Sequence, residues 1–346
     1  MNAFRPKRLI QKEPHMITKP YTYVNESQNP HETLALEEYM LEHIRPGEII
    51  LYLYTHKNSV IIGKNQNAWA ECRHELLSRE QGTLARRISG GGAVFHDVGN
   101  LNFSFIVDKN EYNLTRQLSV ILAAVKSFGI EAEFSGRNDI IVDGKKFSGN
   151  AFCHRKGGSF HHGTILIRVD KENLARYLQV SQDKIESKGV ASVRSRVCNL
   201  IEYNPEINNE NMTRALIRAF EEEYGNAQSY DVTPEARLEV ERVALRNSEW
   251  EWVFGNTPHF DITIKSRFEW GGVEICFALK DAVTQEVKIY SDAMDADFIQ
   301  TISAALTHLQ FRSDVLAGSL KNIPCINAQQ KAMLDDISGF ILEKSF

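Results

Sequence analysis

The sequence predicts an α+β protein with a large first domain and a small C-terminal α/β domain. Short apolar runs typical of strands are interspersed with helix-length segments as far as about residue 255. Three strand-like runs and then two helix-like segments follow, which is a change of pattern. A chain of 346 residues has room for two domains, so we place them at residues 21–255 and 256–346.

The composition excludes several broad classes of protein. Apolar residues make up 42% of the chain and charged residues 25%, as in ordinary globular proteins. A net charge of −5 gives no general attraction to nucleic acid, so any anion site must be local. No apolar run approaches the roughly 18 residues of a membrane span. The five cysteines form no CxxC pair and are typical of reduced thiols. We expect a cytoplasmic monomer that binds neither nucleic acid nor membranes.

Residues 1–20 form a basic leader that we expect to be disordered. The segment contains five Lys or Arg residues and one acidic residue, and it lacks the apolar stretch of a secretory signal. A mitochondrial presequence is the alternative. The absence of serine and the presence of three prolines argue against it.

The large domain is expected to begin with a helix. Asn29 is its predicted N-cap and Pro30 its first residue, a position that suits proline. Strands follow, and then a second helix that Gly129 ends. The expected elements are a helix over 30–44, strands over 49–54, 59–63 and 101–107, and a helix over 114–129.

A β-hairpin is expected between residues 138 and 150. Its two short runs are joined by Asp143-Gly144, a strong turn signal. Residues 157–169 add a turn and a strand, and helices dominate from 171 to about 245. An aromatic segment that ends in a turn then leads into the small domain. That domain is predicted as strands over 260–268, 271–279 and 285–291 and helices over 295–309 and 328–343.

Three consecutive glycines, Gly90 to Gly92, follow a pair of arginines and precede His96-Asp97. A stretch with so little side-chain bulk lets backbone N–H groups face an anion or a flat ring. Neighbours in an extended run point to opposite sides, so one of Arg86 and Arg87 should face the glycines and the other solvent. A turn with no ligand is the alternative for any glycine-rich loop.

The usual phosphate-binding motifs are missing. Neither GxxxxGK[ST] nor a GxGxxG with an acidic residue at dinucleotide spacing occurs, so dispersed Arg and Lys residues must handle any anion. Arg194 and Arg196 are two apart and would share a face of an extended loop. Asn138 and Asp139 could help hold Mg²⁺, or could only cap the hairpin.

The segment from Cys153 to His162 matches no usual structural zinc pattern. Because His161 and His162 alternate along a strand, one is expected in a site and the other at its rim. The same alternation separates Lys145 from Lys146, only one of which can face the glycines.

Four motifs together resemble those of the lipoate–protein ligase family in order and spacing. They are RRISGGGAVFHDVGNLNFSF (86–105), GRNDIIVDGKKFSGNA (136–151), FHHGTIL (160–166) and KGVASVRSRVCNL (188–200), and the resemblance runs from about Tyr23 to the C-terminus. It implies a large domain similar to the biotin–protein ligase fold, with a mixed sheet packed against helices. The implied activity joins lipoate to ATP with Mg²⁺, giving lipoyl-AMP. The lipoyl group then passes to a lysine of apo-lipoyl domains in 2-oxoacid dehydrogenase complexes and in the glycine-cleavage H protein.

The resemblance also assigns residues to roles. Arg87 and residues 92–95 look like the ATP-contacting stretch, and Lys146 looks like the catalytic lysine shared by lipoate and ATP. Residues 186–197 look like the loop that closes over the adenylate. Asp139 is the candidate Mg²⁺ ligand. The candidate binding residues are Arg87, Ser89, Gly90, Gly91, Gly92, Ala93, Val94, Phe95, His96, Asn138, Asp139, Lys146, Ser148, Gly149, Asn150, His162, Lys188, Arg194 and Arg196.

Two rival functions remain open at this point. An acyltransferase of the same fold would use a cysteine thioester, and Cys153 or Cys198 could serve it, although neither has a histidine at a spacing that argues activation. The other rival is an adenylate-binding protein or pure transferase that has lost activation. Such a protein should lack the lysine or an arginine, and both are present here.

Overall fold

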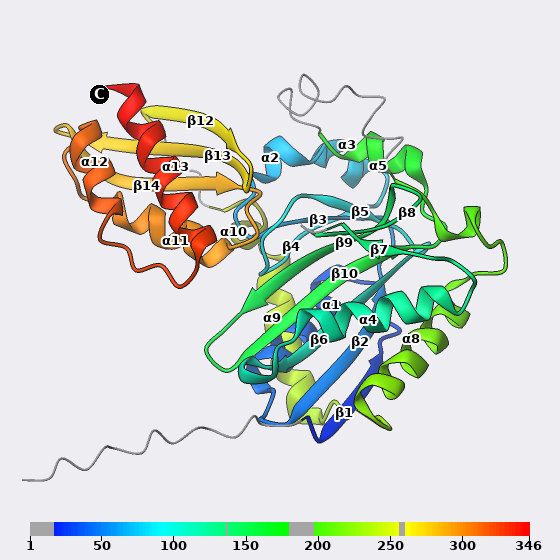
Figure 1. The fold of residues 1–346 in the computed structure, drawn as a ribbon. Coiled ribbons are helices and arrows are strands. Elements are labelled where there is room, and N and C mark those ends of the chain that lie inside the picture. Colours follow the sequence, from blue (N-terminus) through cyan, green and yellow to red (C-terminus); the bar gives the residue numbers. More distant parts are fainter. Residues whose placement is uncertain (1–16, 136–137, 180–196, 256–259) are drawn as a thin grey trace, which may run out of the picture.

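The computed structural model describes residues 17–135, 138–179, 197–255 and 260–346, which form a large domain and a C-terminal domain (Figure 1). An eight-stranded mixed sheet runs through the large domain in the order β11-β1-β2-β6-β10-β9-β8-β7. Only β1 pairs in parallel, with β2 and with β11, among the described strands of this sheet. The strands are β1 (Lys19–Val24), β2 (Glu48–Thr55), β6 (Asn100–Asp108), β7 (Glu133–Phe134), β8 (Asp139–Val142), β9 (Lys145–His154), β10 (Gly158–Leu166) and β11 (Gln228–Ser229).

Helices cover both faces of this sheet. On one face α4 (Leu114–Lys126) and α8 (Asn209–Tyr224) pack on Phe103 and Phe105 of β6. On the other face α1 (Pro30–His43) and α9 (Pro234–Ser248) pack on Ile50, Tyr52 and Ile106. Every residue of β6 is buried, as expected of a central strand with both faces covered.

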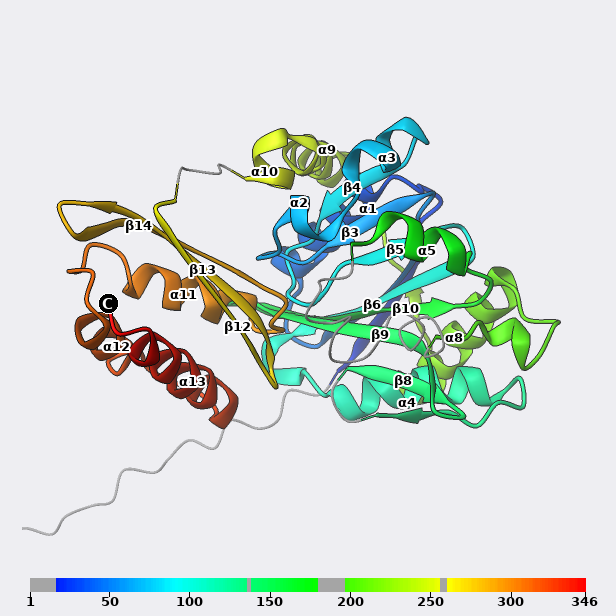
Figure 2. The same cartoon turned by 90° about the horizontal axis from the view of Figure 1, so that it is seen from above.

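A second, three-stranded sheet has the order β4-β3-β5 and lies on the α1 side of the large sheet (Figure 2). Its strands are β3 (Ser59–Ile62), β4 (Thr83–Arg86) and β5 (Val94–His96). The short helices α2 (Ala68–Glu71), α3 (His74–Arg79) and α5 (Lys171–Tyr177) accompany it. The three glycines, Gly90 to Gly92, lie in the loop that connects β4 to β5, and this loop is called the glycine segment below.

The expected elements of the large domain are confirmed within a few residues. Asn29 caps α1 by accepting a hydrogen bond from the His31 N–H, and Pro30 is the first helical residue. The predicted hairpin is β8–β9, with Asp143 (φ 48°) and Gly144 (φ 72°) both left-handed, as a type I′ turn requires. The aromatic segment contains a five-residue helix, α10 (Trp250–Phe254), and the turn expected at its end falls on residues 256–259, outside the described residues.

The small domain is an antiparallel sheet of β12 (Ile262–Phe268), β13 (Gly271–Lys280) and β14 (Val283–Ser291). The helices α11 (Ala296–Ala305), α12 (Ser313–Leu320) and α13 (Ala328–Lys344) share one apolar cluster with it. The sequence predicted two helices here and missed α12. That helix has only eight residues and includes Gly318, so its periodic pattern is too short to stand out.

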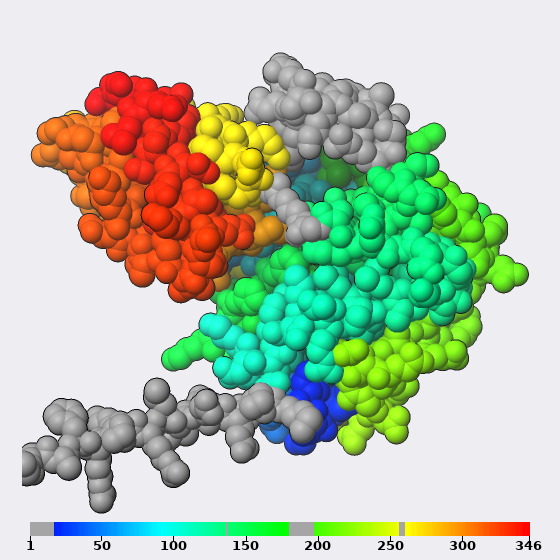
Figure 3. Space-filling model, in the orientation of Figure 1, coloured from blue at the N-terminus to red at the C-terminus, as the bar shows by residue number. Residues whose placement is uncertain are grey.

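Residues 291–297, at the end of β14 and just after it, form non-covalent contacts with the large domain. The Ser291 N–H donates to the Asn65 carbonyl (2.8 Å), and the Gly91 N–H donates to the Ala293 carbonyl (3.2 Å). Lys64 pairs with Asp297 at 2.5 Å. Figure 3 shows the small domain, yellow to red, against one side of the large domain. No helix in the described parts of the chain is long and apolar enough to cross a membrane.

Candidate active site

A cavity lies between the α1 side of the large sheet and the glycine segment. Its floor follows from strand register: Tyr54, Asn102 and Thr164 form one row across β2, β6 and β10, and the N–H of Gly149 on β9 donates to the Thr164 hydroxyl (3.1 Å). The adjacent row on the same face is Tyr52, Ser104, His162 and Ala151. Small and polar side chains on this face leave space that the helices do not fill, so a ligand can lie on the sheet.

The three glycines differ in what they approach. A Cβ on Gly92 would meet nothing within 4 Å, so this residue is open to the cavity. A Cβ on Gly90 would lie 2.3 Å from the Ala293 carbonyl oxygen, and Gly91 has φ +92°. Substrate contact therefore does not explain all three positions. The glycine at 90 is required by the backbone of the small domain, and that at 91 by its own conformation.

Arg87 binds the glycine segment and holds its shape. Its Nη2 donates to the carbonyls of Gly90 and Gly92, each at 2.8 Å, and its Nε donates to the Ser89 Oγ (3.0 Å). Burial lowers the pKa of Arg87 to about 10, and the negative charge of Glu37 opposes that shift. Arg87 therefore remains a buried cation at neutral pH.

Arg86 is not solvated, which corrects the sequence prediction. It does point away from the glycines, but α10 and the loop after β3 cover it. Its guanidinium donates to the carbonyls of Gly63 (3.1 Å), Gln66 (2.7 Å) and Trp252 (3.0 Å). Burial lowers its pKa to about 10. Alternation along the strand was right, and the assumption that the second face is exposed was wrong.

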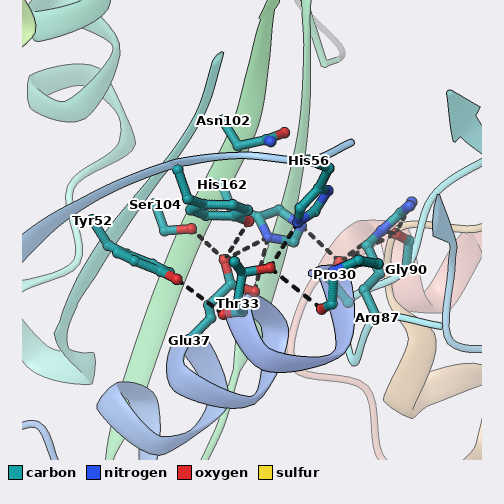
Figure 4. Close-up of polar contacts among 12 residues, drawn as sticks. Pro30, Thr33, Glu37, Tyr52, His56, Arg87, Gly90, Asn102, Ser104 and His162 are labelled. Atoms are coloured by element: carbon teal, nitrogen blue, oxygen red, sulfur yellow. Dashed lines mark hydrogen bonds and ion pairs between the residues drawn. The ribbon is translucent and has the colours of Figure 1, made fainter. Parts of the chain in front are cut away.

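Ser89, His162 and Glu37 form a buried hydrogen-bonded chain. Ser89 Oγ lies 2.9 Å from His162 Nε2, and His162 Nδ1 lies 2.9 Å from Glu37 Oε1. Figure 4 shows Glu37, on α1, meeting His162 of β10 and also Ser104 of β6. Glu37 is 1% exposed, and it accepts a further hydrogen bond from the Tyr54 hydroxyl (3.4 Å). The chain thus links the buried Glu37 carboxylate to the buried Arg87 cation through His162 and Ser89.

A pair of neutral histidines lies at the β2 end of the cavity. The Nδ1 atoms of His56 and His96 are 3.0 Å apart, and His56 Nε2 is 2.7 Å from the Thr33 hydroxyl (Figure 4). Burial lowers the pKa of His56 to about 3 and lowers that of His96 well below its usual range. Because both rings are neutral at physiological pH, one Nδ1 donates to the other. With Leu34 and Ile61 they make this end of the cavity largely uncharged.

Lys146 occupies the opposite, β9 end. Its Nζ lies 2.6 Å from Asp139 Oδ1. A Cβ on Gly149 would lie 2.8 Å from that Nζ, so the ammonium lies over a residue with no side chain. An irregularity in the β8–β9 register makes this possible, because Ile141 pairs with Lys146 while Ile140 pairs with Ser148. Two residues three apart, Lys146 and Gly149, thereby face the same space.

The cavity brings together most of the residues that the sequence singled out. Lys146 lines it, whereas Lys145 is exposed, as strand alternation predicts. The predicted residues that line it are Arg87, Gly91, Gly92, Ala93, Val94, His96, Asn138, Lys146, Gly149, Asn150 and His162. Lys188, Arg194 and Arg196 lie outside the described residues.

Other predicted residues lie behind the wall or away from it. Phe95 faces the opposite side of β5 from Val94 and His96 and packs on Tyr177. Ser148 is fully buried, because the β9 irregularity turns it from the face that Lys146 occupies. Ser89 and Gly90 support Arg87. His161 is not at a rim: it is buried between Phe105 and Phe152 and lies 2.8 Å from Asn150 Oδ1.

Several cavity residues were missed by sequence reasoning. They are Leu34, Tyr54, His56, Ile61, Asn102, Ala151, Gly163, Thr164 and Met294. One signal was available for Glu37, which supports the wall: it lies three residues after Leu34 and four before Leu41 on the buried stripe of α1. A carboxylate there needs a buried partner. Met294 gave no signal, because only the domain arrangement brings it to the cavity.

The described cysteines and carboxylates do not suggest other chemistry. Burial raises the pKa of the Cys153 thiol to about 12 and also raises the pKa of Cys198. Neither thiol lines the cavity described above. Among the described residues no group of three or more His, Cys, Asp and Glu side chains is placed to hold a metal ion. The arrangement instead offers two cations, Arg87 and Lys146, in a cavity whose β2 end is largely uncharged.

Two family models match the chain. Residues 29–221 match the lipoyl protein ligase A/B catalytic domain, and residues 257–341 match the bacterial lipoate protein ligase C-terminus. A relative from Psychrobacter cryohalolentis, named lipoate-protein ligase A, is 36% identical over 323 residues. That match covers 91% of this chain and 95% of the relative.

Solved structures agree with these matches. P. falciparum LipL1 in complex with lipoate has a TM-score of 0.82 at 32% identity, covering 94% of this chain and 99% of that chain. A bipartite lipoate protein ligase of Thermoplasma acidophilum, described with its E2 lipoyl domain, has a TM-score of 0.63 at 27% identity, covering 72% and 100%. A lipoate-protein ligase A bound with ATP has a TM-score of 0.60 at 26% identity, covering 70% and 100%.

Proposed function

Because the chain belongs to the lipoate–protein ligase family, we propose that it converts lipoate and Mg-ATP to lipoyl-AMP and then lipoylates a lysine of apo-lipoyl domains. The acceptors are the lipoyl domains of 2-oxoacid dehydrogenase complexes and the glycine-cleavage H protein. The enzyme works as a monomer in the cytoplasm. Solved relatives with lipoate, with ATP and with an E2 lipoyl domain support the substrates.

The position of Lys146 is the observation that best supports this proposal. Its ammonium lies in the cavity that Gly92 and Arg87 also line. In adenylation the lipoate carboxylate attacks the α-phosphorus, and negative charge builds on phosphoryl oxygens as pyrophosphate departs. A preorganised cation next to that charge lowers the barrier, so Lys146 acts as a cation and not as a base. Mg²⁺ would enter with the nucleotide and neutralise part of its charge, and Asp139, whose Oδ1 pairs with Lys146 here, is the carboxylate that would hold it.

The two ends of the cavity suit the two ends of the acyl chain. Three strand spacings of about 4.8 Å separate β9 from β2 in the sheet. When the lipoate carboxylate lies near Lys146, its acyl chain can extend across β10 and β6 toward Leu34 and Ile61. The neutral His56 and His96 add no charge there, so an apolar tail is not penalised by an ion.

The direct test is intact-mass analysis with purified components. The protein is incubated with ATP, Mg²⁺ and lipoate, with and without an apo-lipoyl domain. We expect one lipoyl group on one lysine of the domain, only when ATP and lipoate are both present. Absence of any mass change on several apo-lipoyl domains, with folded protein, would contradict the proposed function.

A further inference from the structure

The Ser89–His162–Glu37 chain has the atom pairing of a serine–histidine–acid triad, but its serine does not reach the cavity. Ser89 is 1% exposed and is absent from the cavity wall, whereas His162 lines it. A nucleophile must meet its substrate, so the arrangement does not suit attack by Ser89. A histidine at the wall with an acid behind it suits a proton acceptor.

The hydrogen bonds fix which nitrogen of His162 can accept a proton. The Glu37 carboxylate can only accept, so the Nδ1 of His162 donates to it. In the neutral form of the ring, Nε2 therefore carries the lone pair, and it is directed at the Ser89 hydroxyl. Ser89 accepts from the Arg87 Nε, and its own proton has two acceptors, His162 Nε2 at 2.9 Å and the Gly90 carbonyl at 3.5 Å, of which Nε2 is the nearer. If the substrate amine replaces the Ser89 hydroxyl as the hydrogen-bond partner of Nε2, this nitrogen can act as a base.

His162 lies close to where the acyl group would react. It is directly opposite Ala151 in the β10–β9 pair, which makes it a diagonal neighbour of Gly149 on the same face. Diagonal neighbours in such a pair are about 7–8 Å apart at the backbone. The Lys146 ammonium lies over Gly149. A carbonyl or phosphate held by Lys146 is therefore within side-chain reach of the imidazole.

We propose that His162 accepts the proton of the acceptor lysine during the transfer step, with Glu37 as the positioning residue that holds the ring; this rests on the proposed function. The amine nitrogen forms a bond to the acyl carbon, and the bond from that carbon to the phosphate oxygen breaks. AMP leaves with that electron pair. The proton lost by the nitrogen passes to Nε2, and the Glu37 carboxylate stabilises the imidazolium that results.

The test separates the two half-reactions. Adenylation is followed by lipoate-dependent exchange of pyrophosphate into ATP, and transfer by single turnover of preformed lipoyl-AMP with an apo-lipoyl domain. His162→Gln alters the cavity wall, so exchange serves as the internal reference: transfer should slow about 10²-fold more than exchange, a typical loss for a missing general base. Glu37→Gln should show the same split, and it provides the test if His162→Gln does not fold.

Hydroxylamine gives a readout that a merely structural role would not change. It is uncharged at neutral pH and needs no base on the enzyme, so His162→Gln should still form the acyl hydroxamate at nearly the wild-type rate. His161→Gln is the matched control, since His161 is the adjacent residue, is also buried and lies on the opposite face. Any loss of rate in His161→Gln should be the same for exchange and for transfer, and the same with hydroxylamine as with the lysine of the lipoyl domain.

Three results would overturn the proposal. They are equal loss of exchange and transfer in His162→Gln, unchanged transfer in that variant, and loss of transfer in Ser89→Ala together with an acyl group trapped on Ser89 of the wild-type protein. If wild-type protein shows neither exchange nor transfer, the proposed function itself has failed. That outcome is distinct from the other three.

Discussion

Gly90 and Met294 belong to different domains, and a Cβ on Gly90 would lie 2.4 Å from the Met294 carbonyl oxygen. Real Cβ contacts are essentially never that short, and the obstacle is backbone, which cannot rotate away as a side chain can. Met294 itself lines the cavity. The glycine segment therefore forms one wall of the cavity and is also a surface on which the small domain packs.

Gly90→Ala should loosen the small domain without unfolding either domain. The added methyl forces the Ala293–Met294 backbone away, which breaks the hydrogen bond from the Gly91 N–H to the Ala293 carbonyl. Hydrogen exchange at the Ser291 amide, which donates to Asn65 across the interface, should become faster. In Gly92→Ala, where a Cβ meets nothing within 4 Å, this amide should exchange as in wild type. Equal exchange at Ser291 in Gly90→Ala and wild type would refute the docking role.

Acid should destabilise the protein through its buried histidines. Burial lowers the pKa of His56 and of His161 to about 3 in the folded protein, against about 6.5 in an unfolded chain. Between these values the unfolded state binds more protons, so the free energy of unfolding falls as the pH falls below 6.5. The loss is about 1.4 kcal/mol per pH unit for each such histidine. Urea unfolding at several pH values between 7.5 and 4.5 measures it.

A His161→Phe variant checks the assignment of this pH dependence. Phenylalanine keeps the stacking on Phe105 and Phe152 but cannot take up a proton. It loses the contact with Asn150, so the variant should be less stable at neutral pH. Its stability should nevertheless fall less steeply with acid than that of wild type. An unchanged slope would show that His161 does not titrate as described.

Cys153→Ala should retain lipoylation within a few-fold. The thiol is buried, its pKa is raised to about 12, and the thiolate is therefore scarce at neutral pH. Intact mass of wild-type enzyme after incubation with ATP and lipoate should show no acyl group bound to the protein. A covalent adduct in wild type that disappears in Cys153→Ala, together with loss of transfer, would favour a thioester mechanism instead.

Local patterns in the sequence predicted most of the elements, because caps, turn residues and apolar alternation act over a few residues. The β8–β9 hairpin and the start of α1 are examples. The errors at Arg86 and His161 have one cause. Alternation tells which residues share a face, but not what covers that face or where a strand is irregular.

Long-range features of the site could not be predicted from the sequence. Glu37 reaches His162 across 125 residues, and Met294 reaches the cavity only through domain packing. No local pattern links such positions. The motif residues were identifiable because they are glycines, charged residues and asparagines, which contribute little to the packing of a hydrophobic core. Leu34 and Ile61 resemble any core residues, so nothing distinguished them.

The most direct measurement is lipoate-dependent pyrophosphate release by Lys146→Ala and by Lys145→Ala. Lys146 lines the cavity over Gly149, and Lys145, one residue earlier on the same strand, is exposed. Loss of one preorganised electrostatic contact typically costs about 10²–10³ in rate, whereas removing a solvated charge changes little. We predict that Lys146→Ala nearly abolishes release while the protein stays folded, and that Lys145→Ala stays within a few-fold of wild type. Equal loss in the two variants, or a larger loss in Lys145→Ala, would contradict the account.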